Sequence, residues 1–461
     1  MIYLLLLVLL VCLFFAVMVS KGDWMSPGSL FTLAFCFSVG CAIYNVKSWN
    51  LVLHEQAFWV LSGGVCLFVI FSSLVAAVMY TRDGVARARS GGSSPRAVVP
   101  VREIRLETAT VVVATVLSVL VIALYANSLF QAFARLGVGG EWTQAMGTYR
   151  LATASVDDAM YAKLPTYVTY AYQAMAGLAY LMLYVFVNNT VAAGRLNRRT
   201  LYCVPIIAMY LASTVLRGGR LPILEFLGAA ILMYWILWHR MHGWRRLVNM
   251  RALLLVLVVG VGTLFVFSAI RQAVGRTSAL EAIDYITQYG GGSIELFDQF
   301  MQSPPPSSEV WGKETFRGAV GFLGRRFGIE KFMYSYQLEF RSANGIMIGN
   351  VYTAFRYWIR DFGYTGWLVI LGFYSVFYGV FYHRVKHPRA YRSFDYSLVV
   401  YAFLLNGLMF ISIQDMLLAV DLSAGAIFTL VCIRLLGWLL IERPEAKRVP
   451  SESAVLSATH A

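Results

Sequence analysis

Long apolar runs separated by short polar segments dominate the pattern of this 461-residue chain. A helix needs about 20 consecutive apolar residues to cross the hydrocarbon core of a bilayer. Runs of suitable length lie near residues 2–19, 27–45, 55–80, 107–125, 166–187, 200–216, 221–238, 252–270, 365–382, 396–413 and 423–441. The pattern therefore predicts an all-α polytopic integral membrane protein with about 11 transmembrane helices, in a range of about 10–13. The first run lacks a basic leader and a small-residue cleavage site, so we expect a helix there, not a signal peptide.

The composition agrees with a membrane protein. Hydrophobic residues make up 59% of the chain and charged residues 13%, whereas soluble domains have about 45–50% and about 25%. The net charge of +14 sits in short segments between apolar runs, as in loops that face anionic lipid, so membrane lipid is the expected partner and nucleic acid is not. All six cysteines lie in apolar runs without a CxxC pair, which favours packing roles over disulfides or metal binding.

The distribution of Lys and Arg predicts the orientation in the membrane. Basic residues concentrate in segments 82–105, 195–199, 240–251, 384–392 and from 443 onward. If eleven helices alternate, all of these fall on one side, which the positive-inside rule identifies as the cytoplasm. We therefore expect one membrane domain over 1–461, with its N-terminus outside and its C-terminus inside. Its expected loops are a cytoplasmic basic loop at 82–106, a cytoplasmic tail at 442–461, and extracytoplasmic loops at 126–165 and 271–364.

The longest polar stretch that looks ordered is 285–363, inside the largest extracytoplasmic loop. Residues 271–345 carry eight basic and eight acidic side chains. An orientation signal would be one-sided, so this balance predicts internal ion pairs and a folded, partly helical unit.

The turn LRGGR at 216–220 places Arg217 and Arg220 at the outer end of a predicted helical hairpin. Glu225 follows within the next apolar run, where a carboxylate is costly and usually has a partner. Two interpretations stay open: an ion pair with Glu225 that closes the hairpin, or a guanidinium pair that binds phosphate. Arg271, at the exit of the eighth run, either ends a helix at the interface or adds a third guanidinium.

The run Gly290-Gly291-Gly292-Ser293 predicts a flexible turn followed by a helix that Ser293 caps and that continues to about Gln302. Such a helix start could cradle phosphate. Glu295 and Asp298 would also be favourable there through the helix dipole alone.

Two further segments of the loop could contribute to a site. WGKETFRGAVGFLGRRFG, from 311, predicts a short helix with a mostly solvated charged face, and Glu314 is its candidate reactive group. From Asn350, a helical wheel places Thr353, Arg356, Tyr357 and Arg360 with Asn350 in an arc of about 120°. We expect an amphipathic helix ending at Gly363, with that stripe at lipid phosphates or a lipid-linked substrate; the two are compatible.

The six histidines are scattered in loops and the tail without an HExxH motif. Catalytic zinc and a nucleophilic serine are therefore not expected, and we predict no metal and no cofactor.

Five segments resemble the bacterial oligosaccharide repeat-unit polymerases, the Wzy-type O-antigen and exopolysaccharide polymerases. They are SPGSLFTLAF (26–35), LRGGR (216–220), YGGGSIELFD (289–298), GKETFRG (312–318) and NGIMIGNVYTAFRYWIRDFG (344–363), and their order also matches. The resemblance implies a GT-C-like membrane glycosyltransferase at the outer face of the bacterial cytoplasmic (inner) membrane. Its implied donor and acceptor are undecaprenyl-pyrophosphate-linked oligosaccharides, and a Wzz-type chain-length regulator is an implied partner.

The resemblance and the residue chemistry together suggest roles in such a site. The expected pyrophosphate contacts are Arg217, Arg220 and Arg356, then Arg271 and Arg341. The candidate bases are Glu314, Asp298 and Asp361, which the sequence does not separate, and the candidate sugar-binding residues are Asn350, Tyr352 and Thr353.

Two alternatives remain: an O-antigen ligase-like transferase, with a similar donor and another acceptor, and a flippase for lipid-linked oligosaccharides. A flippase would need charges within its spans, where Glu225 and Arg434 are the clear exceptions here. Polar residues concentrated on one side favour an enzyme.

Overall fold

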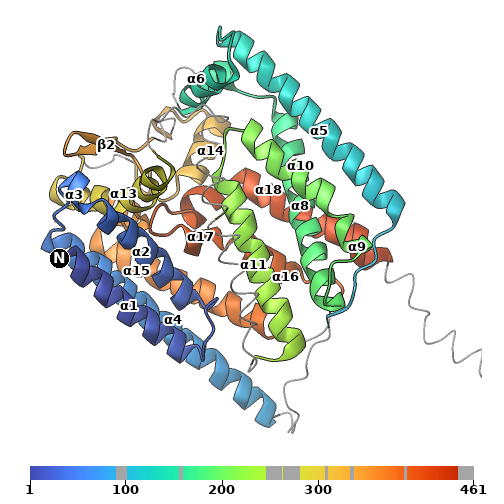
Figure 1. Cartoon of the computed structure of the whole chain (residues 1–461), viewed down its shortest axis with the longest axis horizontal. Helices are drawn as coiled ribbons and strands as arrows, with labels where there is room; N and C mark the ends of the chain where they lie inside the picture. The colour runs from blue at the N-terminus through green and yellow to red at the C-terminus, as the bar shows by residue number, and fades with distance from the viewer. Residues whose placement is uncertain are drawn as a thin grey trace, which may run out of the picture.

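The computed structural model describes residues 1–89, 101–154, 159–244, 262, 281–306, 310–332, 337–388 and 392–444. Within these ranges the chain is a bundle of helices, nine of which are long and apolar enough to cross a membrane (Figure 1). They are α1 (Ile2–Val19), α2 (Pro27–Tyr44), α4 (Glu55–Arg89), α5 (Thr108–Arg135), α8 (Thr166–Ala193), α9 with α10 (Arg198–Leu201 and Val204–Leu216), α11 (Leu221–His242), α15 (Ala354–Lys386) and α18 with η3 (Ala424–Gly437 and Trp438–Glu442).

Nine of the predicted spans are confirmed as membrane-length helices, and the other two differ. The predicted span 396–413 is divided into two short helices, α16 (Tyr396–Phe403) and α17 (Asn406–Met409), followed by a π-helical turn, η2 (Leu417–Asp421). The predicted span 252–270 lies outside the described residues.

One end of the bundle collects the connections in which basic residues were predicted to cluster. Asp23, after α1, accepts from Lys386 Nζ at 2.5 Å near the end of α15. Arg240, near the end of α11, lies 2.8 Å from Asp395, just before α16. These ion pairs join connections far apart in sequence, so the predicted alternation of helices holds for the described residues.

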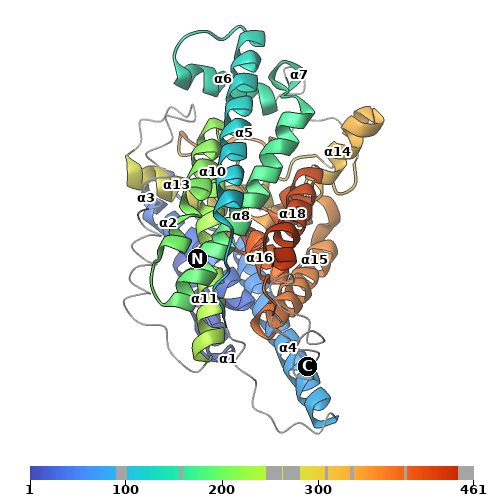
Figure 2. The ribbon, with the colours of Figure 1, turned by 90° about the vertical axis from the view of Figure 1, so that its right-hand side faces the viewer.

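The opposite end carries the polar stretch 285–363. Here α3 (Val46–Trp49), α13 (Ala282–Gln302) and the strands β1 (Arg341–Ala343) and β2 (Ile346–Gly349) lie near one another (Figure 1), and α14 (Arg317–Phe327) lies on the other side of the molecule (Figure 2). Helices α6 (Trp142–Ala154) and α7 (Ala159–Ala162), in the predicted loop 126–165, lie at this end too (Figure 2). The predicted partly helical loop is therefore a folded cap, completed by the 3₁₀ turn η1 (Glu330–Phe332). The antiparallel β1–β2 hairpin is an addition to the predicted all-α fold.

The three consecutive glycines have a different role from the predicted one. Helix α13 begins at Ala282 and runs through Gly290–Gly292, so Ser293 is not its N-cap and no helix start exists there to cradle phosphate. A Cβ on Gly291 would lie 2.4 Å from the backbone nitrogen of Ala42 in α2. The glycines therefore let α13 approach α2 more closely than side chains would permit.

Helix α15 contains the predicted break at Gly363. Its φ of 67° and ψ of −169° interrupt the helical conformation, and glycine is the residue that adopts a positive φ most readily. The segment before Gly363 is thereby set apart from the spanning segment after it. The helix starts at Ala354 rather than near Asn350, because residues 346–349 form β2 and Thr353 is the N-cap.

Candidate functional site

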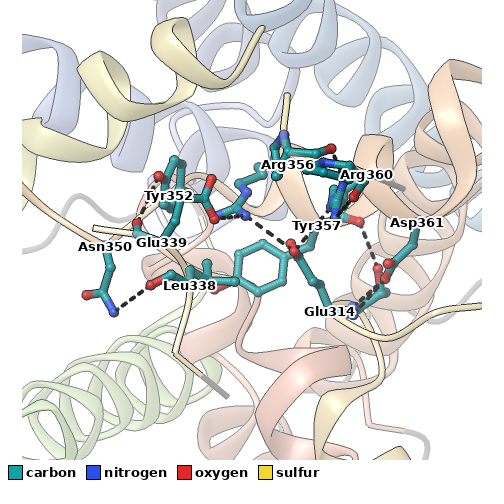
Figure 3. A network of polar contacts seen from close by, with 12 residues as sticks. Glu314, Leu338, Glu339, Asn350, Tyr352, Arg356, Tyr357, Arg360 and Asp361 are labelled. Carbon is teal, nitrogen blue, oxygen red and sulfur yellow. Dashed lines mark hydrogen bonds and ion pairs between the residues drawn. The ribbon is translucent and has the colours of Figure 1, made fainter. Parts of the chain in front are cut away.

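A buried arginine lies at the centre of the cap. Arg356 is 0% exposed, so its side chain does not face lipid phosphates, which was one of the two roles predicted for this stripe. The start of its helix is fixed to the bundle, because the Ala354 amide donates to the carbonyl of Ile411 at 2.9 Å. The chain before α14 and the segment just before β1 cover the guanidinium from the other side (Figure 3).

Arg356 is held by two carboxylates and two aromatic rings. Its Nη2 lies 3.3 Å from Glu314 Oε1 and 2.5 Å from Glu339 Oε2 (Figure 3). The guanidinium carbon stands 3.9 Å from the ring centroid of Tyr352 and 5.3 Å from that of Phe300 on α13. Segments from three parts of the cap therefore converge on one cation, which makes the cap a single unit.

Several polar atoms of this cluster have no hydrogen-bond partner. They are Arg356 Nε and Nη1, Glu314 Oε2, Asp361 Oδ1 and Thr353 Oγ1, all buried. A buried polar group without a partner costs about 1–3 kcal/mol, and more when it is charged. A ligand with both anionic and hydroxyl groups would satisfy these atoms: its anionic group would accept from the free donors of Arg356, and its hydroxyl would donate to the free oxygen of Glu314.

Glu314 lies between the two arginines of the stripe. Arg360 Nε is 3.5 Å from Glu314 Oε1, and Arg360 also donates to the carbonyls of Pro305, at 2.5 Å, and Pro306. Glu314 precedes α14 and occupies a turn, not the predicted helix. Burial raises the pKa of the Glu314 carboxyl, and the positive charge of Arg356 partly opposes that rise.

Asp361 positions Glu314. Its Oδ2 accepts the backbone N–H of Glu314 at 3.0 Å and that of Thr315 at 2.7 Å (Figure 3). The carboxylate thus fixes the turn that presents Glu314 to Arg356.

The two arginines of the LRGGR turn have different surroundings. Arg220 is 4% exposed, and its Nη2 donates to the hydroxyl of Tyr285 on α13. Arg217 is exposed, stands 5.1 Å from the ring centroid of Tyr172, and lies within electrostatic reach of Glu225. The described contacts leave both predicted roles of this turn open.

A small apolar cluster joins the LRGGR turn to the buried arginine. Phe410, Ile413 and Met416 form its buried centre, after α17. The residues packed around it include Leu221 of α11, Tyr289 of α13 and Val351, shortly before α15. The elements that carry Arg220 and Arg356 therefore meet on one apolar support.

Besides the Arg356 cluster and the LRGGR turn, the structure contains a third polar group, in which an aspartate binds a histidine. The sequence pattern did not predict this pairing. Asp298 Oδ2, His54 Nδ1 and Gln302 Nε2 lie 2.8 Å from one another. A carboxylate oxygen can only accept, so both nitrogens donate to it, which places the imidazole proton on Nδ1 and leaves Nε2 as an acceptor. The side chain of His54 is 51% exposed, whereas that of Asp298 is 3% exposed.

The remaining predicted site residues line the edges of the cap. Arg341 donates to the Ser303 carbonyl at 2.7 Å, and Asn350 donates to the carbonyl of Leu338 at 3.4 Å. The Tyr352 hydroxyl donates to the carbonyl of Glu339 at 3.1 Å. These three residues brace the chain around Arg356, while Arg271 lies outside the described residues.

Asp415 is a buried carboxylate that the pattern also did not single out. It is 0% exposed and accepts from Trp358 Nε1 at 2.7 Å, from the Leu418 amide at 3.0 Å and from the Tyr374 hydroxyl. Trp358 and Tyr374 lie on the two sides of the Gly363 break. Asp415 therefore ties both parts of α15 to the support beneath the cap.

Comparison of the chain with protein-family models, with curated proteins and with solved structures found no match.

Proposed function

We propose that the chain is a membrane glycosyltransferase that polymerises undecaprenyl-pyrophosphate-linked oligosaccharide repeat units at the outer face of the bacterial cytoplasmic membrane. The observation that carries the proposal is the buried Arg356–Glu314 pair, with free guanidinium donors beside a free carboxylate oxygen. A transferase that expels pyrophosphate needs both features: a cation for the departing charge and a base for the attacking hydroxyl. The resemblance of the five sequence segments supplies the substrate class.

In the proposed reaction, a hydroxyl oxygen of the acceptor sugar forms a bond to the anomeric carbon of the donor glycan. The bond from that carbon to the pyrophosphate oxygen breaks, and the electron pair leaves with undecaprenyl pyrophosphate. Glu314 takes the hydroxyl proton through its free Oε2. Arg356 and Arg217 stabilise the charge that develops on the leaving group.

The contacts of the three candidate bases differ. Asp361 Oδ2 accepts two backbone N–H groups, and Asp298 accepts from His54 and Gln302. Asp361, like Glu314, keeps one buried oxygen without a partner. Glu314 is the carboxylate that contacts both Arg356 and Arg360, and burial raises its pKa, so it is the base we propose, with Asp361 as its positioning residue.

The separate environments of the LRGGR arginines suggest a test of the proposal. Arg217→Ala removes an accessible cation, so we expect normal amounts of folded protein and glycans that carry single repeat units. Arg326→Ala, which removes another exposed arginine of the cap, is the matched control and should leave chain length normal. Glycan length on gels, from cells that carry each variant as their only copy, gives the measurement. Long chains from Arg217→Ala would refute the leaving-group role of this arginine.

The proposed orientation has its own test. A reporter fused near Pro305 should be active outside the cytoplasm, and one fused near Ser93 inside it. The opposite result would place the polar cap in the cytoplasm and exclude an outer-face polymerase.

A further inference from the structure

Two cysteine thiols meet inside the membrane-spanning part of the bundle. The Sγ atoms of Cys12, on α1, and Cys66, on α4, lie 3.2 Å apart, and both residues are partly exposed. The two residues are separated by 54 positions in the sequence, so helix packing, not local chain geometry, brings them together.

The two thiols also lie at matching depth. Cys12 and Cys66 are each about three helical turns from the start of their helices, about 16 Å at 1.5 Å per residue. Both helices start at the end of the bundle that carries the cap (Figure 1). The contact is therefore a side-by-side one between parallel helices near mid-membrane.

The two sulfur atoms, 3.2 Å apart, are already close to the separation of a disulfide bond. A disulfide needs an S–S separation of about 2.05 Å. Four residues of α1 are buried: Ile2, Leu5, Leu9 and Ala16. Helix α1 nevertheless packs directly against α4, so the two cysteine side chains stay adjacent while their sulfurs approach. On its lipid side Val11 and Phe14 are 60% and 68% exposed, so a lipid-soluble molecule reaches this helix without unfolding it.

We infer that Cys12 and Cys66 form a disulfide when a lipid-soluble quinone oxidises them. The two thiols lose two protons and two electrons, a sulfur–sulfur bond forms, and the quinone takes both protons and both electrons to become a quinol. The contact between the thiols keeps the two sulfurs next to each other for this reaction. The inference depends on the packing of α1 and α4 and not on the proposed glycosyl transfer.

The disulfide would fasten α1, one of the least buried of the described spanning helices, to α4 and through α4 to the site. Helix α4 contacts the first part of α15 directly, since a Cβ on Gly64 would lie 2.5 Å from the Phe355 ring. Phe355 precedes Arg356. A covalent bond between α1 and α4 would therefore stabilise the support of the buried arginine, and the midpoint of thermal aggregation should rise on oxidation.

The test uses the full-length protein in membrane vesicles. Vesicles are treated with decylubiquinone, then denatured and labelled with a polyethylene-glycol maleimide that counts free thiols among the six cysteines. Wild type should lose two labelled thiols, and Cys36→Ser should still lose two. Cys12→Ser and Cys66→Ser should lose none. Full labelling of quinone-treated wild type, or equal loss in Cys12→Ser, would overturn the inference.

Peptide mass analysis of the wild type gives a second readout that needs no variant. The peptides containing Cys12 and Cys66 should appear linked, at the sum of their masses less two hydrogens, and separate again after reduction. Linkage of any other cysteine pair in their place would also overturn the inference.

Discussion

Glu314 and Glu339 form a matched pair for testing the proposed base, because both carboxylates contact the same nitrogen of Arg356. Replacing either by Gln keeps the shape and one acceptor oxygen and removes one negative charge beside the guanidinium. If Glu314 takes the proton from the acceptor hydroxyl, Glu314→Gln removes general-base catalysis and Glu339→Gln does not.

The magnitudes follow from the two environments. General-base catalysis contributes about 10²–10⁴-fold, or about 2.7–5.5 kcal/mol, so Glu314→Gln should reduce the polymerisation rate by at least about 100-fold. Glu339 is 32% exposed and therefore screened by solvent. Its loss should cost at most about 1–2 kcal/mol of stability and less than about tenfold in rate. Glu314→Gln should lose more stability than Glu339→Gln, since Glu314 also contacts Arg360 and is less exposed.

The assay measures repeat units added per minute in membranes, normalised to folded protein from fluorescence-detected size exclusion, with the melting midpoint recorded in parallel. Near-normal polymerisation by Glu314→Gln would refute the assignment of the base. If both variants lost the same polymerisation rate without a change in melting midpoint, the negative charge around Arg356 would determine the rate, and proton transfer to Glu314 would not.

The pH dependence has a defined sign. The base must be ionised, and burial raises the pKa of Glu314. The rate should therefore fall as pH decreases through that raised pKa, at a higher pH than for an ordinary glutamate. This acid limb should be absent from the residual activity of Glu314→Gln, and its persistence would assign the limb to another group.

Three further predictions concern the support of the site. Gly291→Ala should lower the free energy of unfolding by about 1–3 kcal/mol, seen as a lower melting midpoint, because the new methyl group meets the backbone of α2. Gly292→Ala should lower it less, because its methyl group meets a movable isoleucine side chain. Equal losses in the two variants would contradict the close packing. Asp415→Asn should cost about 1–3 kcal/mol in the same measurement, since its carboxylate accepts from three donors and an amide offers one acceptor oxygen. His54→Ala should loosen α13 by leaving Asp298 with fewer donors, so the amides of α13 should exchange hydrogen faster, and unchanged exchange would show that the contact does not hold the helix.

Much of the bundle could be predicted from the sequence because the hydrophobic requirement of a membrane helix is local. Nine predicted runs became helices of membrane length. The span at 396–413 is followed by an irregular segment that hydropathy does not detect: Asp415 accepts side-chain donors from α15 and the Leu418 amide of a π-helical turn. From the sequence alone, Asp415 is a single carboxylate just beyond an apolar run, and nothing local shows that it is buried in irregular backbone.

The site depended more on contacts between distant residues. The wheel placed Arg356 and Arg360 on a common polar stripe, but it could not show that segments 310–316 and 337–343 would bury that stripe. The three glycines indicated conformational freedom, whereas their use is close approach to α2, which only the position of the neighbouring helix reveals. His54 and Asp298 are 244 residues apart, so no local pattern could pair them.

The carboxylates around Arg356 have a consequence for turnover. Without a ligand the guanidinium already holds two anionic groups of the protein itself. On the proposed function, an arriving pyrophosphate binds the free Nε and Nη1 donors while both carboxylates stay on Nη2, so their negative charge offsets part of the attraction that appears as affinity. The same repulsion acts on the spent carrier after transfer. The protein thus weakens its own hold on the product, which favours rapid release of the carrier over tight retention.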